Sequence, residues 1–283
     1  MRTKKKHRIK RRFTPGIAIL LLILVLSLLP FAIMLIGSFK PTMAFSIVPI
    51  DFSPFTNVTL DNFRKVIETV NISQAFGNSL YIVVLVVGTE IFLSLTAGYV
   101  FAVKQFPFRR VLFGLVIVTM MLPRQLLLVP NFMVAKQLNL IDSLTGVALT
   151  TINASYGIFL TRQFVLSIPK DYFDAARIDG CSELGVFIRV IVPFLKPAIA
   201  GIAIYSMFGT WNDYLWQNVM LSSNSKQTVP LMLAYLANKS VNGIPSIGLQ
   251  LAGSVIAVVP MIIFFLIFQK WFIEGISAGG VKE

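Results

Sequence analysis

The charged side chains inside long apolar runs are the residues of this sequence best placed to do chemistry. Glu90 lies near the middle of one run, Asp213 lies in the segment TWNDYLWQN, and Arg124 follows Pro123. A charge at the centre of a bilayer costs about 2.5–3.5 kcal/mol on insertion scales, so it must be compensated. We therefore expect polar partners or a polar path around Glu90 and Asp213. For Arg124 we favour a helix break or a side chain that reaches out to the membrane surface.

A second group combines aromatic faces with hydrogen-bonding tips, namely Trp211, Asn212, Asp213, Tyr214, Trp216 and Gln217. Such side chains stack on the C–H face of a sugar ring and bond its hydroxyls. They also form aromatic belts at membrane interfaces or pack helices, and we favour these alternatives because the group sits late in its apolar run. Asn153, in another run, is equally well explained by an interhelical hydrogen bond. The candidate solute path consists of Glu90, Asn153, Trp211, Asn212, Asp213 and Tyr214.

Several kinds of catalysis are excluded by composition. Cys181 is the only cysteine and His7 is the only histidine. No internal disulfide can form, and no cluster of Cys, His and carboxylates exists to bind zinc. A Ser-His-Asp arrangement is implausible because the single histidine lies in the N-terminal tail. We therefore expect no catalytic residue, no metal and no cofactor in this chain.

The elements that position these residues are membrane-spanning helices. Of the 283 residues, 56% are hydrophobic and only 13% are charged, about half the charged share of a soluble domain. Each run is long enough to cross about 30 Å of hydrocarbon, and none has the alternating pattern of a barrel strand. We predict an all-α membrane protein with six transmembrane helices, in the runs 16–36, 80–103, 111–134, 144–165, 197–221 and 247–272.

The positions of the basic residues predict the orientation. The 25 Lys and Arg outnumber the 12 Asp and Glu, which gives a formal net charge of +13, and the basic residues concentrate in the N-terminal tail. Because basic residues are retained on the cytoplasmic side, we expect both termini there. We assign residues 1–15 as a basic cytoplasmic tail that sets topology and touches anionic lipid, not nucleic acid. No clear cleavage site follows the first run, so we expect it to remain as a helix.

The six-helix domain, residues 16–272, contains two polar interruptions. The external loop 40–76 begins with three prolines that keep it extended, and its segment TLDNFRKVIETV has the apolar spacing of a short interfacial helix. The cytoplasmic loop 167–196 reads as a helix, a tight turn and a second helix. Pro169 suits the start of the first helix and Gly180 suits the left-handed position that ends it.

The first helix of the cytoplasmic loop has a spacing that suits contact with another surface. Tyr172, Ala175, Ala176 and Asp179 recur at intervals of three to four, so two small alanines lie together on one turn. Pro193 then interrupts the second helix. We call the cytoplasmic loop 167–196 the elbow. We expect it either to be bound by a partner or to serve only as an ordered connector.

The sequence DAARIDGCSELGVFIRVIVP in this loop resembles the EAA loop of binding-protein-dependent ABC importer permeases. The family pattern is Glu-Ala-Ala, three residues, Gly, nine residues, then Ile, one residue, Leu and Pro. The spacing is kept throughout, with Asp in place of Glu and Val in place of Ile and Leu. The matching residues are Asp174, Ala175, Ala176, Gly180, Val190, Val192 and Pro193. The runs MLPRQLLLVP, WNDYLW and QKWFIEGISAGGVKE add to a resemblance to the smaller permease of the maltose-type carbohydrate class.

The resemblance implies an ABC importer type I permease fold in a bacterial or archaeal cytoplasmic membrane. It also implies three partners: a second homologous permease, an ABC ATPase dimer inside and an extracytoplasmic sugar-binding protein outside. ATP and Mg²⁺ would be used by the ATPase, and this agrees with the absence of a G-x-x-x-x-G-K-[ST] loop from this sequence. For Glu90 we then favour pairing with a polar group of the partner permease.

The same resemblance assigns contacts with the ATPase. The coupling residues would be Asp174, Ala175, Ala176, Asp179, Gly180 and Pro193. The C-terminal tail, residues 273–283, would remain extended because of its glycines and would reach the ATPase interface, with a solvated flexible end as the alternative. Its contact residues would be Glu274, Gly275, Gly279 and Gly280.

The function expected is therefore the translocation of a sugar, first of all an oligosaccharide, by a subunit coupled to a separate ATPase. The alternative is an ion-coupled secondary transporter or channel that acts without an ATPase. That class needs its own coupling charges and often has internal repeats. Only Glu90, Arg124 and Asp213 are candidates for such charges, and no repeat is evident. A membrane enzyme is disfavoured because no acid, base and nucleophile cluster together.

Overall fold

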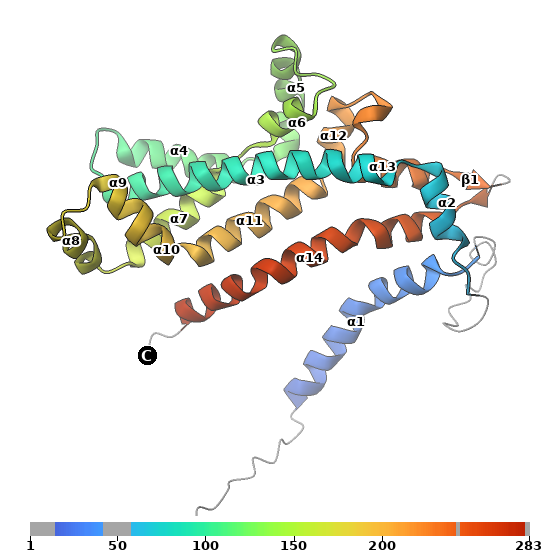
Figure 1. Ribbon diagram of the computed structural model, residues 1–283, viewed down its shortest axis with the longest axis horizontal. Helices are drawn as coiled ribbons and strands as arrows, with labels where there is room; N and C mark the ends of the chain where they lie inside the picture. Colours follow the sequence, from blue (N-terminus) through green and yellow to red (C-terminus); the bar gives the residue numbers. More distant parts are fainter. Residues whose placement is uncertain (1–14, 42–57, 242–243, 281–283) are drawn as a thin grey trace, which may run out of the picture.

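The structure is a computed structural model that describes residues 15–41, 58–241 and 244–280. The basic tail up to residue 14, the segment 42–57 with two of the loop's three prolines, and residues 281–283 lie outside the described residues. The elements in chain order (Figure 1) are α1 (Pro15–Ser38), α2 (Asp61–Thr69), α3 (Ile72–Val103), α4 (Arg109–Met121), η2 (Arg124–Leu127), α5 (Leu128–Gln137), α6 (Leu144–Thr151), α7 (Ser155–Ser167), α8 (Lys170–Ile178), α9 (Glu183–Gly185), η3 (Val186–Ile191), α10 (Val192–Phe194), α11 (Lys196–Trp211), α12 (Tyr214–Met220), η4 (Asn224–Lys226), α13 (Val229–Ala237), β1 (Ser240–Val241), β2 (Ile244–Pro245) and α14 (Ile247–Gly280).

The described part of the chain is nearly all helical, as the apolar runs predicted. Its only strands are β1 and β2, which pair antiparallel with Ser240 opposite Pro245 and Val241 opposite Ile244. Three helices are each long and apolar enough to cross a membrane: Gly16–Ser38 in α1, Ile72–Val103 and Ile247–Trp271 in α14. They coincide with the first, second and sixth predicted runs.

The remaining runs are broken helices. α4 and the helical segment Arg124–Gln137 meet at 97°, and α6 and α7 meet at 48°. The fifth run is broken at residues 212 and 213, between α11 and α12. A third bent pair joins α11 at 73° to residues Glu183–Phe194, which we assigned to the cytoplasmic loop. Six spans result if each bent pair is one span, so the count of six and the orientation of the termini remain predictions.

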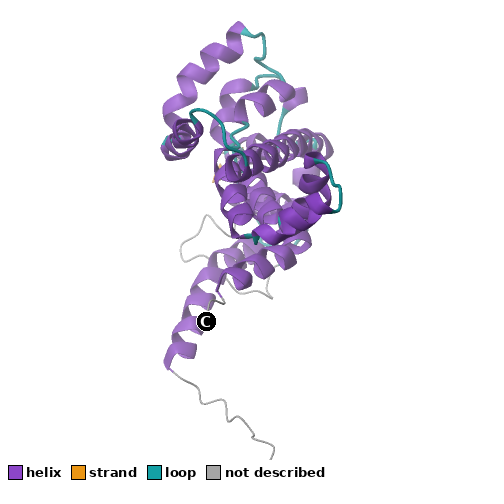
Figure 2. Cartoon of the chain, turned by 90° about the vertical axis from the view of Figure 1, so that its left-hand side faces the viewer, coloured by secondary structure: helices purple, strands orange, loops and turns teal. Residues whose placement is uncertain are grey.

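The helices pack along a common direction, with α1 at the edge. Figures 1 and 2 show the N-terminal end of α1 leaning away from the other helices. Its apolar side chains are largely exposed, as suits a helix surrounded by lipid. At its other end, the buried Asn62 amide of α2 donates to the carbonyls of Ser38 at 2.9 Å and Lys40 at 2.7 Å. Asn62 therefore fixes the end of α1 against the predicted short helix, α2.

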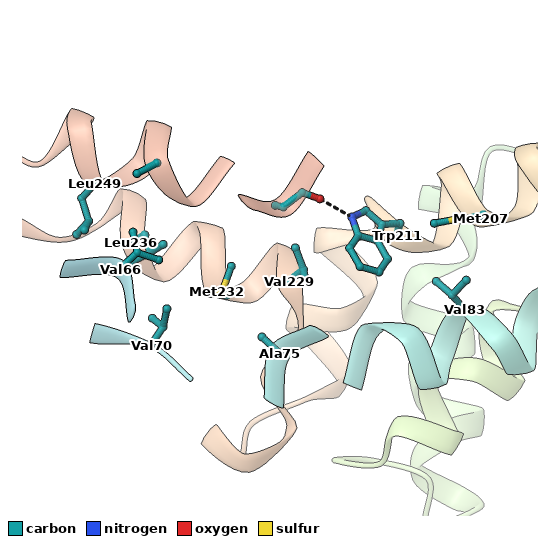
Figure 3. Packing of buried hydrophobic residues seen from close by; sticks show 12 residues of the cluster. Val66, Val70, Ala75, Val83, Met207, Trp211, Val229, Met232, Leu236 and Leu249 are labelled. Atoms are coloured by element: carbon teal, nitrogen blue, oxygen red, sulfur yellow. Dashed lines mark hydrogen bonds between the residues drawn. The ribbon is translucent and has the colours of Figure 1, made fainter. Parts of the chain in front are cut away.

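A buried apolar cluster joins five helices in one half of the molecule. Figure 3 shows Val66 of α2, Val83 of α3, Trp211 of α11, Met232 of α13 and Leu249 of α14 among its members. None of these side chains is more than 8% exposed. The cluster holds α2 and α13 across the ends of the long helices.

The closest helix contact joins α3 and α7 through small residues. Ser94 and Gly98 are four apart on α3, and Gly157 and Thr161 are four apart on α7. A Cβ atom added at Gly157 would lie 1.9 Å from the Ser94 hydroxyl, and one at Gly98 would lie 2.6 Å from Thr161 Cβ. Each glycine thus receives the small polar residue of the other helix, the arrangement by which membrane helices approach closely.

The C-terminal helix is longer than predicted. α14 extends to Gly280, so the expectation of an extended tail from residue 273 is wrong as far as Gly280. Extending a helix that already exists forms one hydrogen bond per residue without the cost of nucleation. This gain outweighs the penalty of about 1 kcal/mol that each glycine carries relative to alanine.

The α3–α7 contact makes a specific prediction for stability. Gly157→Ala forces the two helices apart and, as overpacking, costs about 1–3 kcal/mol of stability. Gly88→Ala is the matched control on α3, because nothing lies within 4 Å of a Cβ added there. Thermal unfolding in detergent should give a lower Tm for Gly157→Ala than for wild type and for Gly88→Ala. Equal Tm values for the two variants would contradict the close contact.

Candidate functional site

The first predicted site, the elbow, is built around a helix stop at Gly180. Gly180 has φ +81°, the left-handed conformation expected at this position. The N–H of Cys181 donates to the Ala176 carbonyl at 3.0 Å, and the N–H of Gly180 donates to the Arg177 carbonyl at 3.0 Å. These two bonds form a Schellman motif, which ends α8 and turns the chain toward α9. The predicted helix start is also found, since Pro169 immediately precedes α8.

The inner face of the elbow packs on the chain's own helices. Phe173 and Ala176 are each 7% exposed and join a buried cluster with Leu95 of α3, Val186 and Ile191. Ala175, by contrast, is exposed.

The expectation that Ala175 and Ala176 together offer a surface to a partner is therefore wrong for Ala176. Neighbouring residues on a helix point about 100° apart, so one alanine faces outward while the next faces the core. Ala176 is small because its own chain packs against it.

The outer face of the elbow exposes several apolar side chains, among them Ile178, which we did not single out from the sequence. Ile178 is 85% exposed and Leu184 is 66% exposed, on either side of the turn at Gly180. Ile188 and Tyr172 are about half exposed. Large exposed apolar groups on an ordered loop mark an interaction surface. The signal in the sequence was the presence of such residues in a loop that was otherwise predicted to be polar.

The second helix of the elbow is irregular. Val186–Ile191 is π-helical and leads into α10, and the chain bends at Leu195 rather than at Pro193, where we expected the interruption. Pro193 lies within the continuous helical segment Glu183–Phe194, directly after the π-helical residues, and the helix ends one residue later. Pro193 is exposed, as are Asp174, Asp179 and Gly180.

A chain of ion pairs ties the elbow to α3. The Arg177 guanidinium lies 3.2 Å from Asp174 Oδ1 and 3.4 Å from Glu183 Oε1. Lys104, just beyond α3, places its Nζ 2.6 Å from Glu183 Oε2. The hydrogen bond from Lys104 lowers the pKa of Glu183 below its usual value, against a small opposing effect of burial. These groups are about half exposed, so each pair contributes little alone and acts mainly as a tether.

The second predicted site is an open cavity of about 610 Å³ between the broken helices. Its wall includes Leu122 and Arg124 from the break between α4 and α5, and Asn153 from the break between α6 and α7. Asp213, between α11 and α12, completes the wall from a third break. Discontinuous helices are tolerated at membrane depth where they line a cavity, and transporter binding sites are often built this way.

Two carboxylates, the buried Glu90 and the partly exposed Asp213, support two of these breaks. Glu90 is 3% exposed and accepts a hydrogen bond from the backbone N–H of Asn153 at 2.7 Å. Asp213 accepts from the N–H of Trp216 at 3.1 Å and thereby caps α12. Both negative charges lie at the start of a helix, where the dipole favours them. Glu90 thus has a partner within its own chain and lies behind the cavity wall, not in it.

The aromatic group predicted around Asp213 is divided by the structure. Trp211 points away from the cavity: it is 4% exposed, and its Nε1 donates to the Ala257 carbonyl of α14 at 3.3 Å (Figure 3). Asn212 donates to the Phe208 carbonyl of its own helix, and neither Asn212 nor Tyr214 lines the cavity. Helix packing, the alternative favoured for this group, therefore describes Trp211.

Of the two tryptophans in the aromatic group, Trp216 lines the cavity wall and Trp211 does not. The Nε1 of Trp216 donates to Thr150 Oγ1 at 2.9 Å, and the Tyr205 ring joins the wall from α11. The difference follows from the break at residues 212 and 213, which rotates α12 relative to α11. Among the described residues, no group of three His, Cys, Asp or Glu side chains could hold a metal ion.

The broken helices, the cavity and the exposed elbow of this nearly all-helical chain are consistent with a membrane permease. A family model for "Binding-protein-dependent transport system inner membrane component" matches residues 90–278, and the chain belongs to this family. The resemblance drawn from the elbow sequence is thereby confirmed, and the chain is a multi-pass cytoplasmic-membrane permease of the ABC importer class.

Similar proteins cover almost the whole chain. The arabinooligosaccharides transport system permease protein AraQ of Halalkalibacterium halodurans is 36% identical over 281 residues, which cover 96% of this chain and 99% of AraQ. AraQ of Bacillus subtilis is also 36% identical, over 94% of this chain and 95% of its own length. A chain in the crystal structure of a bacterial ABC transporter involved in the import of alginate has the same fold, with a TM-score of 0.80, 23% identity and coverage of 95% of this chain and 100% of that one.

The turn at Gly180 gives a second prediction. Gly180→Ala places a residue with a Cβ in the left-handed region, at a cost of about 1–2 kcal/mol, whereas Gly180→Asn is tolerated better because Asn adopts this conformation more readily. Nothing lies within 4 Å of the added Cβ, so only the backbone is affected. Hydrogen exchange should show weaker protection of the Gly180 and Cys181 amides in the Ala variant than in the Asn variant. Unchanged protection in Gly180→Ala would contradict this description of the turn.

Proposed function

We propose that this chain is the transmembrane permease subunit of an ATP-driven importer of a sugar, first of all an oligosaccharide. The observation that carries the proposal is the cavity formed where three broken helices meet, in a chain whose other end carries an exposed apolar elbow. The two AraQ relatives are named as permease proteins of arabinooligosaccharide transport systems, and these names support a sugar as the solute.

In the cavity, the sugar would meet aromatic faces and hydrogen-bonding groups. Trp216 and Tyr205 offer rings, and Asn153, Asp213 and Arg124 offer polar groups. Aromatic rings bind the C–H faces of sugars and polar tips bind their hydroxyls, the combination expected of a carbohydrate site. Glu90 has a positioning function in this proposal, since it fixes the backbone of Asn153 without lining the cavity.

At the elbow, an ABC ATPase would bind the exposed face. Asp174, Ala175, Asp179, Gly180 and Pro193 remain the proposed coupling residues, and all five are exposed. Their apolar neighbours Ile178 and Leu184 would supply most of the buried area. Ala176 would contribute from within, by allowing α8 to pack closely on its own chain. The ATPase would use ATP and Mg²⁺, and this chain would bind neither.

The α3–α7 pair would connect the two sites. α7 begins beside the cavity at Ser155 and ends at Ser167, next to the elbow. Two contacts hold α7 along α3. Gly157 packs against Ser94, and Thr161 packs against Gly98. Movement of the elbow by the ATPase would therefore move the start of α7 and the wall of the cavity.

The assembly we propose has a second homologous permease, an ATPase dimer and an extracytoplasmic sugar-binding protein, in a bacterial or archaeal cytoplasmic membrane. The chain would cross six times with both termini inside. Residues 1–15 would form the basic tail, 16–272 the permease domain and 273–283 the C-terminal tail. The proposed tail contacts with the ATPase are Glu274, Gly275, Gly279 and Gly280.

Substitution of the exposed elbow tests this function. Ile178→Glu leaves the folded core unchanged because the side chain is 85% exposed, but it buries an unpaired charge if the ATPase covers it. Such a charge costs about 2–5 kcal/mol, so we expect ATP-dependent sugar uptake in proteoliposomes to fall more than about tenfold. Leu138→Glu is the control, because Leu138 is 61% exposed and lies outside the elbow. This variant should transport normally.

The outcome also separates the importer from a secondary transporter. Normal uptake by Ile178→Glu, or sugar uptake by this chain on an ion gradient without an ATPase, would contradict the proposed function. Loss of uptake together with loss of sugar-stimulated ATP hydrolysis, in an assembled and monodisperse complex, would support it.

A further inference from the structure

We propose that this chain also carries a binding site for the phosphate headgroup of an anionic membrane lipid, in the loop between α3 and α4. The site is a cavity of about 690 Å³ that shares no residue with the solute cavity. Its wall combines three arginines with three phenylalanines: Arg109, Arg110, Arg162, Phe106, Phe108 and Phe113.

The arginines are held close together by the end of α3. Arg109 donates to the Phe101 carbonyl through Nε at 3.0 Å and through Nη2 at 2.6 Å. Arg162 of α7 donates to the same carbonyl at 3.3 Å, and its guanidinium lies 4.3 Å from the centre of the Phe113 ring. Two like charges thus share one acceptor, an arrangement that favours an anion nearby.

No acidic side chain supplies that anion within the described part of the protein. The ion pairs found there involve none of Arg109, Arg110 and Arg162. Each guanidinium has five N–H donors, and the Phe101 and Ala102 carbonyls use only a few of them. Arginine forks match phosphate oxygens well, so a phosphate group would satisfy both the charge and the remaining donors.

The apolar surroundings favour a phosphate that carries acyl chains. None of the residues of α4 is buried. Val111 is 61% exposed and Leu115 is 56% exposed, while Phe108 at the mouth of the cavity is 77% exposed. A lipid with its headgroup at the arginines would therefore have an apolar helix along which to lay its chains.

The position of the loop fits the cytoplasmic leaflet. Figure 1 shows the start of α4 at the same end of the molecule as α8 and α9, and Lys104 contacts Glu183 there. On the topology of the proposed function, on which this inference rests, that end faces the cytoplasm. Anionic lipids attract basic groups at that surface by about 1 kcal/mol per charge, and basic pockets between membrane helices bind their headgroups.

Photolabelling of the assembled transporter tests the site. The probe is phosphatidylglycerol with a diazirine in its acyl chain, in phosphatidylcholine liposomes, and labelled residues are mapped by mass spectrometry. We expect label on α4, and at least about a tenfold loss of it in Arg110→Gln/Arg162→Gln, because each substitution removes a positive charge and charge-assisted hydrogen bonds to the phosphate. Arg64→Gln, at an 80% exposed arginine of α2, is the control. In this variant the probe should label α4 as strongly as in wild type.

A further variant and further probes distinguish an anionic lipid from other possible occupants of this cavity. Arg110→Gln alone should reduce labelling without affecting folding, since among the described residues the Arg110 side chain has no hydrogen bond or ion pair. Equal labelling of α4 by a diazirine phosphatidylcholine, or unchanged labelling in the double variant, would overturn the site. Displacement of the label by inorganic phosphate, or its replacement by a crosslink to the ATPase, would also overturn the lipid as its occupant. The readout requires no transport, so it can fail or succeed independently of the proposed function.

Discussion

The close approach of α3 and α7 is the contact on which the rest of the structure depends. Glu90, Ser94 and Gly98 recur every four residues along one face of α3, and all three meet α7 or the break that precedes it. Further along, the Phe101 carbonyl accepts from Arg162 of α7, and Lys104 pairs with Glu183 of the elbow. Lipid provides no hydrophobic drive for helices to associate, so small residues and polar contacts must hold such a pair together. One helix face thus fixes both the cavity and the elbow.

The cavity shows how a membrane protein can keep irregular backbone inside a bilayer. Each break frees backbone groups that lipid cannot satisfy. Glu90 and Asp213 satisfy two of these breaks by accepting N–H bonds at helix starts, and the broken ends then face a polar space with Asn153 and Arg124. Glu90 and Asp213 therefore have a structural explanation, and the solute path that we propose consists of the groups that line the cavity.

The sequence predicted what depends on composition and local conformation. Long apolar runs identified the helical segments, and Pro169 and Gly180 correctly placed the two ends of α8, because their backbone preferences act locally. Of the bends inside the runs, only the one beside Pro123 and Arg124 was anticipated, as one of two explanations of that arginine. The others were not predicted, since hydropathy is averaged over a run and contains no information on where a helix breaks. For the same reason Trp211 was grouped with Asp213, although the break turns them in different directions. The inward direction of Ala176 depends on packing with α3, which is distant in the sequence.

The most direct test of the shared α3–α7 support is a distance measured by pulsed electron paramagnetic resonance in the assembled transporter. Spin labels would be placed at Phe92→Cys on α3 and Asp171→Cys on α8, both exposed, with Cys181→Ser to remove the native thiol. If α3, α7 and the elbow move as one body, the nucleotide-free and ATP-trapped transporters will give the same distance distribution. A distribution that shifts between the two states would show that the elbow moves against α3, and would contradict the rigid connection between elbow and cavity.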